Sequence, residues 1–227
     1  NKTMGQDCDI MVAKHNVSRE DQDLFAKRSH DNAEKAWEVG HHQKEVVPVE
    51  IEPDFKMIKK DNGIRSGTPI EKLSKLKPAF DKKHGTLTAA NSSFLTDGSA
   101  VCLIMTESKA KELGFTPKAE IVDYCFTGQR LEDELLLGPA YAMSKVLDQT
   151  KLSLNDIDVF EIHEAFAGQV LTNIKCLADD EFCKIELLKE KPVGEIDINK
   201  VNKWGGSLSI GHPFGATGAR LLTTAAN

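Results

Sequence analysis

The chain is organised around one stretch near its end, Trp204-Gly205-Gly206-Ser207-Leu208-Ser209-Ile210-Gly211-His212-Pro213-Phe214-Gly215-Ala216-Thr217-Gly218-Ala219-Arg220. Proline is favoured at the first position of a helix, so we expect a turn holding His212 and a helix from about Pro213 towards Asn227. The positive end of that helix favours a neutral imidazole, which can accept a proton near pH 7. The same pattern is also typical of a tight turn and a closely packed helix, and its glycines match no phosphate-binding loop.

Length and composition narrow the classes of protein. The 227 residues suffice for one large or two small domains, and the net charge of −6 argues against a general nucleic-acid binder. Five cysteines without a C-x-x-C pair favour reduced thiols over a disulfide framework or a metal site. No apolar run reaches the roughly 18 residues of a membrane-spanning helix. Because the chain begins with Asn1 and stops inside a predicted helix at Asn227, we expect a fragment or the ordered part of a longer protein.

The first 84 residues read as helices followed by a basic loop. Residues 1–44 are predicted to form two helices, with a break at residues 16–18, an N-cap at Ser18 and an end at Gly40. A proline demotes residues 46–51 to an edge strand. The lysine-rich segment 52–84 is typical of a solvated face, or of a surface for an anionic ligand such as a nucleotide phosphate.

From Gly85 onwards, apolar runs alternate with helical patterns. Strands are expected at 86–90, 100–105, 119–126 and 157–162, and helices at 107–113, 141–147 and 165–177. Strands that alternate with helices indicate an α/β fold.

Two further stretches carry candidate site residues. His163 and Glu164 follow a predicted strand directly, and ligand chemistry in α/β folds gathers at the carboxyl ends of strands. Alternatively, Glu164 only opposes the dipole of the next helix. The polar link 89–98 contains Ser92 and Ser93, whose hydroxyls could meet a ligand or could form a capped turn.

Together the three stretches resemble the thiolase family in order and spacing. The matching segments are Leu87-Thr88-Ala89-Ala90-Asn91-Ser92-Ser93 with Asp97-Gly98, His163-Glu164-Ala165-Phe166, and Gly205-Gly206 with Gly211-His212-Pro213. The resemblance covers nearly the whole chain and is strongest to the β-subunit type of 3-ketoacyl-CoA thiolase, which has His where most of the family has Asn at position 163. It implies part of a layered αβαβα fold with an inserted helical and loop domain. Residues 1–84 would form the CoA-binding loop domain, 85–116 the end of the N-terminal thiolase domain, and 117–227 a truncated C-terminal domain.

The resemblance also implies a reaction. Thiolases cleave a 3-ketoacyl-CoA with free CoA, which is a substrate and not a resident cofactor; no metal is implied. His212 matches the base that activates a nucleophilic cysteine, His163 the position that helps to hold a water in an oxyanion hole, and Glu164 a residue that orients His212 or nearby water. The positions that match the CoA channel are Met4, Arg65, Phe80, Ala89, Ser93 and Phe166.

None of the five cysteines lies in the family's nucleophile context, so we expect the 227-residue chain to be inactive alone. Two alternatives stay open: an acetoacetyl-CoA thiolase that runs the condensation, and a non-catalytic thiolase-like protein that binds acyl-CoA or lipid. The implied partners are acyl-CoA and CoA, a second copy of the chain, an α-subunit and a peripheral membrane surface, but no nucleic acid. The implied location is the mitochondrial matrix or inner membrane.

Overall fold

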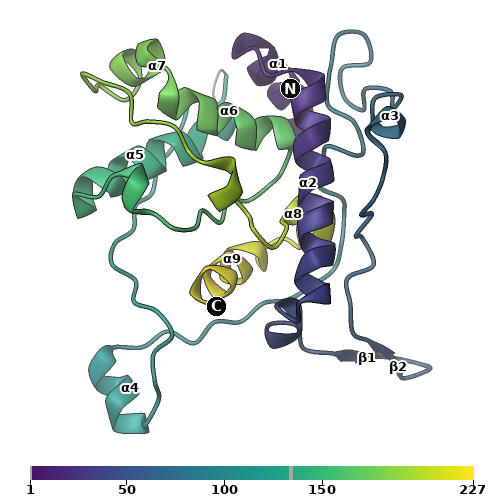
Figure 1. Ribbon diagram of the computed structural model, residues 1–227, viewed down its shortest axis with the longest axis vertical. Coiled ribbons are helices and arrows are strands. Elements are labelled where there is room, and N and C mark those ends of the chain that lie inside the picture. The colour runs from purple at the N-terminus through teal and green to yellow at the C-terminus, as the bar shows by residue number, and fades with distance from the viewer. Residues whose placement is uncertain (1, 133–134) are drawn as a thin grey trace.

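A computed structural model describes residues 2–132 and 135–227, and the described part is mostly helical (Figure 1). In chain order the helices and strands are α1 Met4–Lys14, α2 Arg19–Glu38, the 3-10 turn η1 His42–Lys44, β1 Val49–Ile51, β2 Lys56–Ile58, α3 Ile70–Leu73, α4 Glu107–Leu113, η2 Leu135–Leu137, α5 Gly138–Thr150, η3 Leu154–Asp156, α6 Ala167–Ala178, α7 Asp180–Ile185, η4 Ile198–Lys200, α8 Ser207–Ile210 and α9 Thr217–Ala226. No helix of the described part is long and apolar enough to cross a membrane.

The N-terminal helices form as their sequence predicts. The Ser18 side chain accepts a hydrogen bond from the backbone N–H of Asp21 and so caps one of the free donors at the start of α2. Asn16, at the break between α1 and α2, has a φ of 53°, and Gly40 beyond α2 has a φ of 80°. Both left-handed residues stop a helix, which confirms the predicted break and the predicted end.

The core lies where α2 and α6 cross and α1, α5 and α8 pack around them. Its fully buried apolar side chains include Val12, Leu137, Val170, Leu177 and Leu208. Each such side chain contributes about 1.5–3 kcal/mol of hydrophobic stabilisation. The core fixes α6 and α8, and these two helices position the candidate site.

The expected sheet does not form within the described residues, which corrects the predicted α/β alternation. The regular sheet there is a single hairpin, in which β1 pairs antiparallel with β2, Val49 opposite Ile58. Residues 157–162 contribute one isolated parallel bridge, Phe160 to Val201. Segments 86–90, 100–105 and 119–126 have no strand structure.

The missing strands have a physical cause. A strand needs a neighbour to pair its backbone, and no described residues pair with 100–105 or 119–126. Their apolar side chains are correspondingly bare, since Val101 is 87% and Phe126 85% exposed. In Figure 1 the two segments run as extended arms on either side of α4, which stands away from the rest of the fold.

The glycine-rich stretch near the C-terminus also differs from its prediction. Helix α9 begins at Thr217, not at Pro213, because Gly215 takes a φ of 84° that a right-handed helix cannot contain. His212 therefore lies in the loop between α8 and α9 and not in a first helical turn. The position of the helix dipole no longer explains a neutral imidazole there.

Candidate functional site

Two histidines from distant parts of the sequence meet in the fold. The ring centroids of His163 and His212 lie 3.9 Å apart, with 33° between the ring planes. His163 follows the bridge residue Phe160 on the way into α6, and His212 comes from the loop before α9. The fold thus joins two of the three predicted catalytic residues.

A buried hydroxyl holds each imidazole. The Nδ1 atom of His163 lies 2.8 Å from Oγ of Ser207, and Nδ1 of His212 lies 2.7 Å from Oγ1 of Thr217. Ser207 is the first residue of α8 and Thr217 the first of α9, so each helix start fixes one ring. Because Nδ1 is occupied in both rings, Nε2 is the atom that each offers to a ligand.

The surroundings keep both rings neutral. Burial lowers the pKa of His163 to about 4, and the neighbouring His212 and Arg220 add to that effect. Burial and the Arg220 charge also lower the pKa of His212. A neutral imidazole near pH 7 can accept a proton, which the sequence predicted for His212 from a different cause.

Glu164, the residue after His163, lies in a buried hydrogen-bond network of its own. Its carboxylate is fully buried and accepts hydrogen bonds from Oγ of Ser29 at 2.7 Å, from Nδ2 of Asn202 at 2.7 Å and from the N–H of Leu208 at 3.1 Å. Burial raises the pKa of this carboxyl group, and the bonds from Asn202 and Ser29 oppose that rise. These three hydrogen bonds connect α2, α8 and Asn202 through the Glu164 carboxylate. Glu164 therefore holds the surrounding elements in place.

Residue Gly206 explains how this acid fits. A Cβ atom at position 206 would lie 2.4 Å from the carboxyl carbon of Glu164, which is far inside contact distance. The missing side chain lets the backbone of the loop before α8 pass directly over the carboxylate.

The Ser93 segment runs alongside the His163 segment. The N–H of Ser93 donates to the carbonyl of Ala165 at 2.9 Å, and the N–H of Ala167 donates to the carbonyl of Asn91 at 2.9 Å. Ser92 and Phe166 form the antiparallel bridge between these bonds. Ser93 is therefore placed beside the residues that follow His163, as a wall of the same site.

The aromatic candidates form a second wall. The rings of Phe80 and Phe166 meet edge to face, with centroids 5.7 Å apart. A Cβ at Gly5 would lie 2.4 Å from the Phe80 ring, so the start of α1 packs directly on that ring. Met4, the residue before Gly5, leaves 52% of its surface exposed, and Ala89 is also exposed. These side chains offer apolar surface to a ligand.

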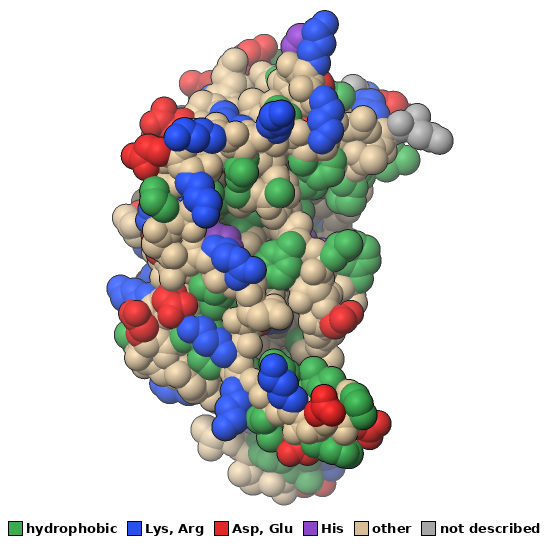
Figure 2. Space-filling model, turned by 90° about the vertical axis from the view of Figure 1, so that its right-hand side faces the viewer, with side chains coloured by type: hydrophobic (Ala, Val, Ile, Leu, Met, Phe, Trp, Pro, Cys, Tyr) green, Lys and Arg blue, Asp and Glu red, His purple; other side chains and the backbone are tan. Residues whose placement is uncertain are grey.

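Arg65 lies apart from the histidines. Its guanidinium Nη1 donates to the carbonyls of Asn62 at 2.7 Å and Ile64 at 3.0 Å, and so folds back on its own loop. That loop reaches the Ser93 segment through Phe94, whose ring would lie 2.0 Å from a Cβ at Gly63. Figure 2 shows lysine and arginine side chains running down the face that carries residues 52–84. The loop and its basic face therefore border the site without entering it.

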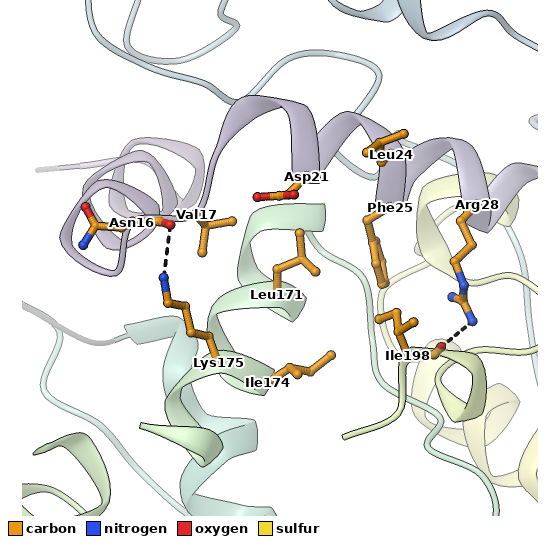
Figure 3. A pocket seen from close by; sticks show the side chains of 10 residues that line it. All are labelled: Asn16, Val17, Asp21, Leu24, Phe25, Arg28, Leu171, Ile174, Lys175 and Ile198. Atoms are coloured by element: carbon orange, nitrogen blue, oxygen red, sulfur yellow. Dashed lines mark hydrogen bonds between the residues drawn. The ribbon is translucent and has the colours of Figure 1, made fainter. Parts of the chain in front are cut away.

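The groove drawn in Figure 3 is a separate feature. It has a volume of about 370 Å³, lies between α2 and α6, and is lined by apolar residues such as Phe25, Leu171 and Ile174. None of the predicted site residues lines it.

The sequence did not reveal every residue that builds the site. Ser207, Thr217 and Asn202 fix the two histidines and Glu164, yet each is an ordinary residue of a polar loop until the chain folds. Asn202 clamps the backbone of Ile162 with bonds of 2.8 Å to both its N–H and its carbonyl. The one signal in the sequence was that Asn202 lies close to Gly205 and Gly206, a pair of glycines that is typical of a turn.

Comparisons with known proteins agree with this fold. Of solved structures, the dimeric peroxisomal thiolase of Saccharomyces cerevisiae superposes with a TM-score of 0.79 at 35% identity, covering 99% of this chain and 52% of that one. The chain thus has the fold of thiolases. The profile of the thiolase N-terminal domain matches residues 1–108, and that of the C-terminal domain residues 115–227. The chain belongs to the thiolase family.

Its curated relatives include 3-ketoacyl-CoA thiolases and β-subunits of the trifunctional enzyme. The chain is 53% identical over its whole length to a probable 3-ketoacyl-CoA thiolase of Caenorhabditis elegans, of which it covers 50%. It is 50% identical over its whole length to the mitochondrial trifunctional enzyme subunit beta of Rattus norvegicus, of which it covers 47%. The chain spans about half the length of the curated relatives it matches.

Proposed function

We propose that the protein is a 3-ketoacyl-CoA thiolase of mitochondrial fatty-acid β-oxidation. The observation that carries this proposal is the pair of neutral imidazoles, His163 and His212, each tethered at Nδ1 and open at Nε2. Acyl transfer through a thiolate needs a base for the thiol and donors for a developing oxyanion. The Ser93 and Phe166 wall beside the pair then holds the acyl-CoA.

The residues take roles that follow from their placement. His212 accepts the thiol proton of the nucleophilic cysteine at Nε2. The thiolate attacks C3 of the 3-ketoacyl-CoA, and His163 and His212 hold the oxygen that gains charge, directly or through a water. The bond between C2 and C3 then breaks with its electron pair on C2. A second cysteine of the full-length protein donates a proton to C2, so that acetyl-CoA leaves, and regains its proton from the thiol of free CoA. Finally, the thiol of free CoA takes the acyl group from the cysteine, giving an acyl-CoA two carbons shorter.

The cysteines of this chain do not fit the nucleophile. Burial raises the pKa of the Cys8 thiol far above its usual range, so it stays protonated. Cys176 lies 3.4 Å from Nδ1 of His15 but is completely buried, beyond the reach of a substrate. We therefore propose that the nucleophile belongs to another part of the full-length protein, and that the 227-residue chain alone is inactive.

The remaining roles are part of the same proposal. Met4, Phe80, Ala89, Ser93 and Phe166 line the pantetheine channel, and Arg65 with the basic 52–84 face meets the phosphates of CoA. Residues 1–84 act as the loop domain, 85–116 as the end of the N-terminal domain, and 117–227 as the C-terminal domain. A second copy is a partner, supported by the dimeric yeast neighbour. The name of the rat relative supports an α-subunit of a trifunctional complex as partner and a mitochondrial location. Peripheral membrane association is the last part of the proposal.

The test uses the full-length protein and 3-ketoacyl-CoAs of increasing chain length, with acetyl-CoA formation as the readout. We expect CoA-dependent cleavage that His212→Ala reduces by about 10²–10⁴, while Arg130→Ala, at an exposed arginine outside the proposed site, leaves it intact. Cleavage and condensation confined to acetoacetyl-CoA would indicate the biosynthetic class. Binding of acyl-CoA without turnover would indicate a non-catalytic thiolase-like protein.

A further inference from the structure

One face of α9 carries a stripe of polar side chains that reaches three other segments. The stripe consists of Thr217, Arg220, Thr224 and Asn227, which share a face because they are three or four residues apart. Thr217 holds His212, as described above. Arg220 Nη1 lies 3.5 Å from Oε2 of Glu161.

The far end of the stripe is anchored to the turn that follows α2. Oγ1 of Thr224 donates to one carboxylate oxygen of Glu45 at 2.9 Å, and Nδ2 of Asn227 donates to the other at 3.0 Å. Glu45 also contacts Nε2 of His41 at 3.2 Å. Because these bonds fix α9 along its length, they also fix where the Arg220 guanidinium lies.

The contact between Arg220 and Glu161 joins the two segments that carry the imidazoles. Glu161 comes two residues before His163, so in an extended segment the two share a side. Arg220 comes one helical turn after Thr217, the tether of His212. The pair therefore spans from the His163 segment to the helix that holds His212.

The contact between Arg220 and Glu161 is expected to contribute little to the stability of the fold. The Glu161 side chain is 3% and the Arg220 side chain 19% exposed, so both charges are largely removed from water. Within the described residues, the buried atoms Nη2 of Arg220 and Oε1 of Glu161 have no hydrogen-bond partner. A buried ion pair with unused groups offsets little of its desolvation penalty, which favours a role for the charge itself.

We propose that Arg220, anchored by Glu161, is a positioning residue whose charge disfavours protonation of His163 and His212 in addition to the effect of their burial. The catalytic part of this inference rests on the function proposed above, whereas the effect on the two imidazoles does not.

The electrostatics of the neighbourhood agree. After burial, the Arg220 charge lowers the pKa of both His163 and His212. Burial raises the pKa of Glu161 to about 7, against the opposing effect of Arg220. The other charged or titratable groups of this neighbourhood are His41, His42, Glu45, Asp61 and Glu164.

The test measures each histidine directly in the full-length protein. Exchange of the imidazole C2 hydrogen, followed by mass spectrometry of peptides, gives a pKa for every histidine without any need for activity. Arg220→Gln should raise the pKa of His163 and His212 by about one pH unit. Arg220→Lys keeps the charge and should hold the pKa values near those of the wild type, and Arg130→Gln, at an exposed arginine, should change neither.

Activity supplies the second readout. In Arg220→Gln the acid limb of the pH profile of kcat/KM should move up by the same amount, and Arg220→Lys should restore it. A folded Arg220→Gln protein with unchanged histidine pKa values overturns the inference, and so does an equal shift in Arg220→Lys. A histidine shift in a protein that shows no thiolysis in any variant overturns the proposed function and leaves the inference standing.

A further variant covers the case in which Arg220→Gln does not fold. The double variant Glu161→Gln/Arg220→Gln removes the positive charge and leaves no unpaired buried acid, so the pKa values of His163 and His212 should rise by about one pH unit, as in Arg220→Gln. Unchanged histidine pKa values in a folded double variant contradict the inference.

Discussion

The rings of His163 and His212 lie 3.9 Å apart, and each is tethered at Nδ1 by the first side chain of a different short helix. The two hydrogen bonds orient both rings through Nδ1, so they do not use either Nε2 atom. Because one imidazolium would repel another at this distance, the pair takes up a second proton far less readily than a first. Such a pair can accept a proton from a thiol and still offer a neutral donor to an oxyanion.

The tethers should matter for turnover more than for folding. Thr217→Val and Ser207→Ala each remove one hydroxyl, whose hydrogen bond is worth about 1 kcal/mol, so kcat/KM of the full-length protein should fall about fivefold in each. Thr223→Val is the matched control, because Thr223 bonds only to a carbonyl of its own helix among its described contacts. Equal rates for Thr217→Val and Thr223→Val would show that the hydroxyl does not orient His212.

The close packing of Gly206 against Glu164 predicts that alanine substitutions at Gly206 and Gly218 change stability in opposite directions. Gly206→Ala places a Cβ 2.4 Å from the carboxyl carbon of Glu164 and should lower the free energy of unfolding by about 1–3 kcal/mol. Gly218→Ala, in α9, meets nothing within 4 Å and should raise it by about 0.5–1 kcal/mol. Urea unfolding midpoints of the two variants measure the difference, and similar midpoints would contradict the described packing.

Buried histidines make the stability depend on pH. Burial lowers the pKa of His42 and of His163 to about 4, below the ordinary value of 6.5. The unfolded chain therefore takes up protons first, so the stabilising effect is complete above pH 6.5 and is lost as pH falls towards 4, by about 1.4 kcal/mol per pH unit for each histidine. Glu161 acts in the opposite direction, because its raised pKa favours the folded state below about pH 7.

The contribution of a single histidine is separated by a difference measurement. Unfolding midpoints of wild type and His42→Gln, compared between pH 7.5 and pH 5, should show a shallower decline in the variant. The exposed His84, changed to Gln, serves as control and should decline like the wild type. If the unfolding midpoints of all three proteins decline equally between pH 7.5 and pH 5, His42 does not contribute to the pH dependence of stability.

Arg65 should affect CoA binding and not the chemical step. If its guanidinium meets the CoA phosphates, Arg65→Ala raises KM for CoA about tenfold with kcat unchanged, and the effect weakens at high salt. Arg130→Ala removes an equally exposed arginine and should leave KM as it is. If KM stays the same in Arg65→Ala, Arg65 serves only to shape its loop through Asn62 and Ile64.

Local signals in the sequence predicted the helices well. The cap at Ser18 depends on one side chain and the end at Gly40 on one left-handed glycine, and both form as predicted. Strand formation depends on a partner elsewhere, so the apolar runs at 100–105 and 119–126 gave the wrong local structure for the described residues. The start of α9 was misplaced because the left-handed Gly215 outweighed the preference of Pro213 for a helix start.

In the candidate site, too, residues with a local sequence signal were predicted, and residues that depend on distant contacts were not. The sequence named His163, Glu164 and His212 as candidates, and the fold places the two histidines in contact and Glu164 in a buried network with Ser29, Asn202 and Leu208. The tethers Ser207 and Thr217 could not be predicted, since each depends on how a loop and a helix meet in three dimensions. Arg220 carried no sequence signal, because its partner Glu161 is 59 residues away.

The two extended arms beside α4 also determine how the chain behaves in a crowded solution. They present unpaired backbone donors and acceptors together with bare side chains such as Val101, Tyr124 and Phe126. Extended segments with unpaired backbone groups and apolar side chains can pair with the same segments of other copies. At high protein concentration we therefore expect residues 100–105 and 119–126 to be where copies of the chain associate.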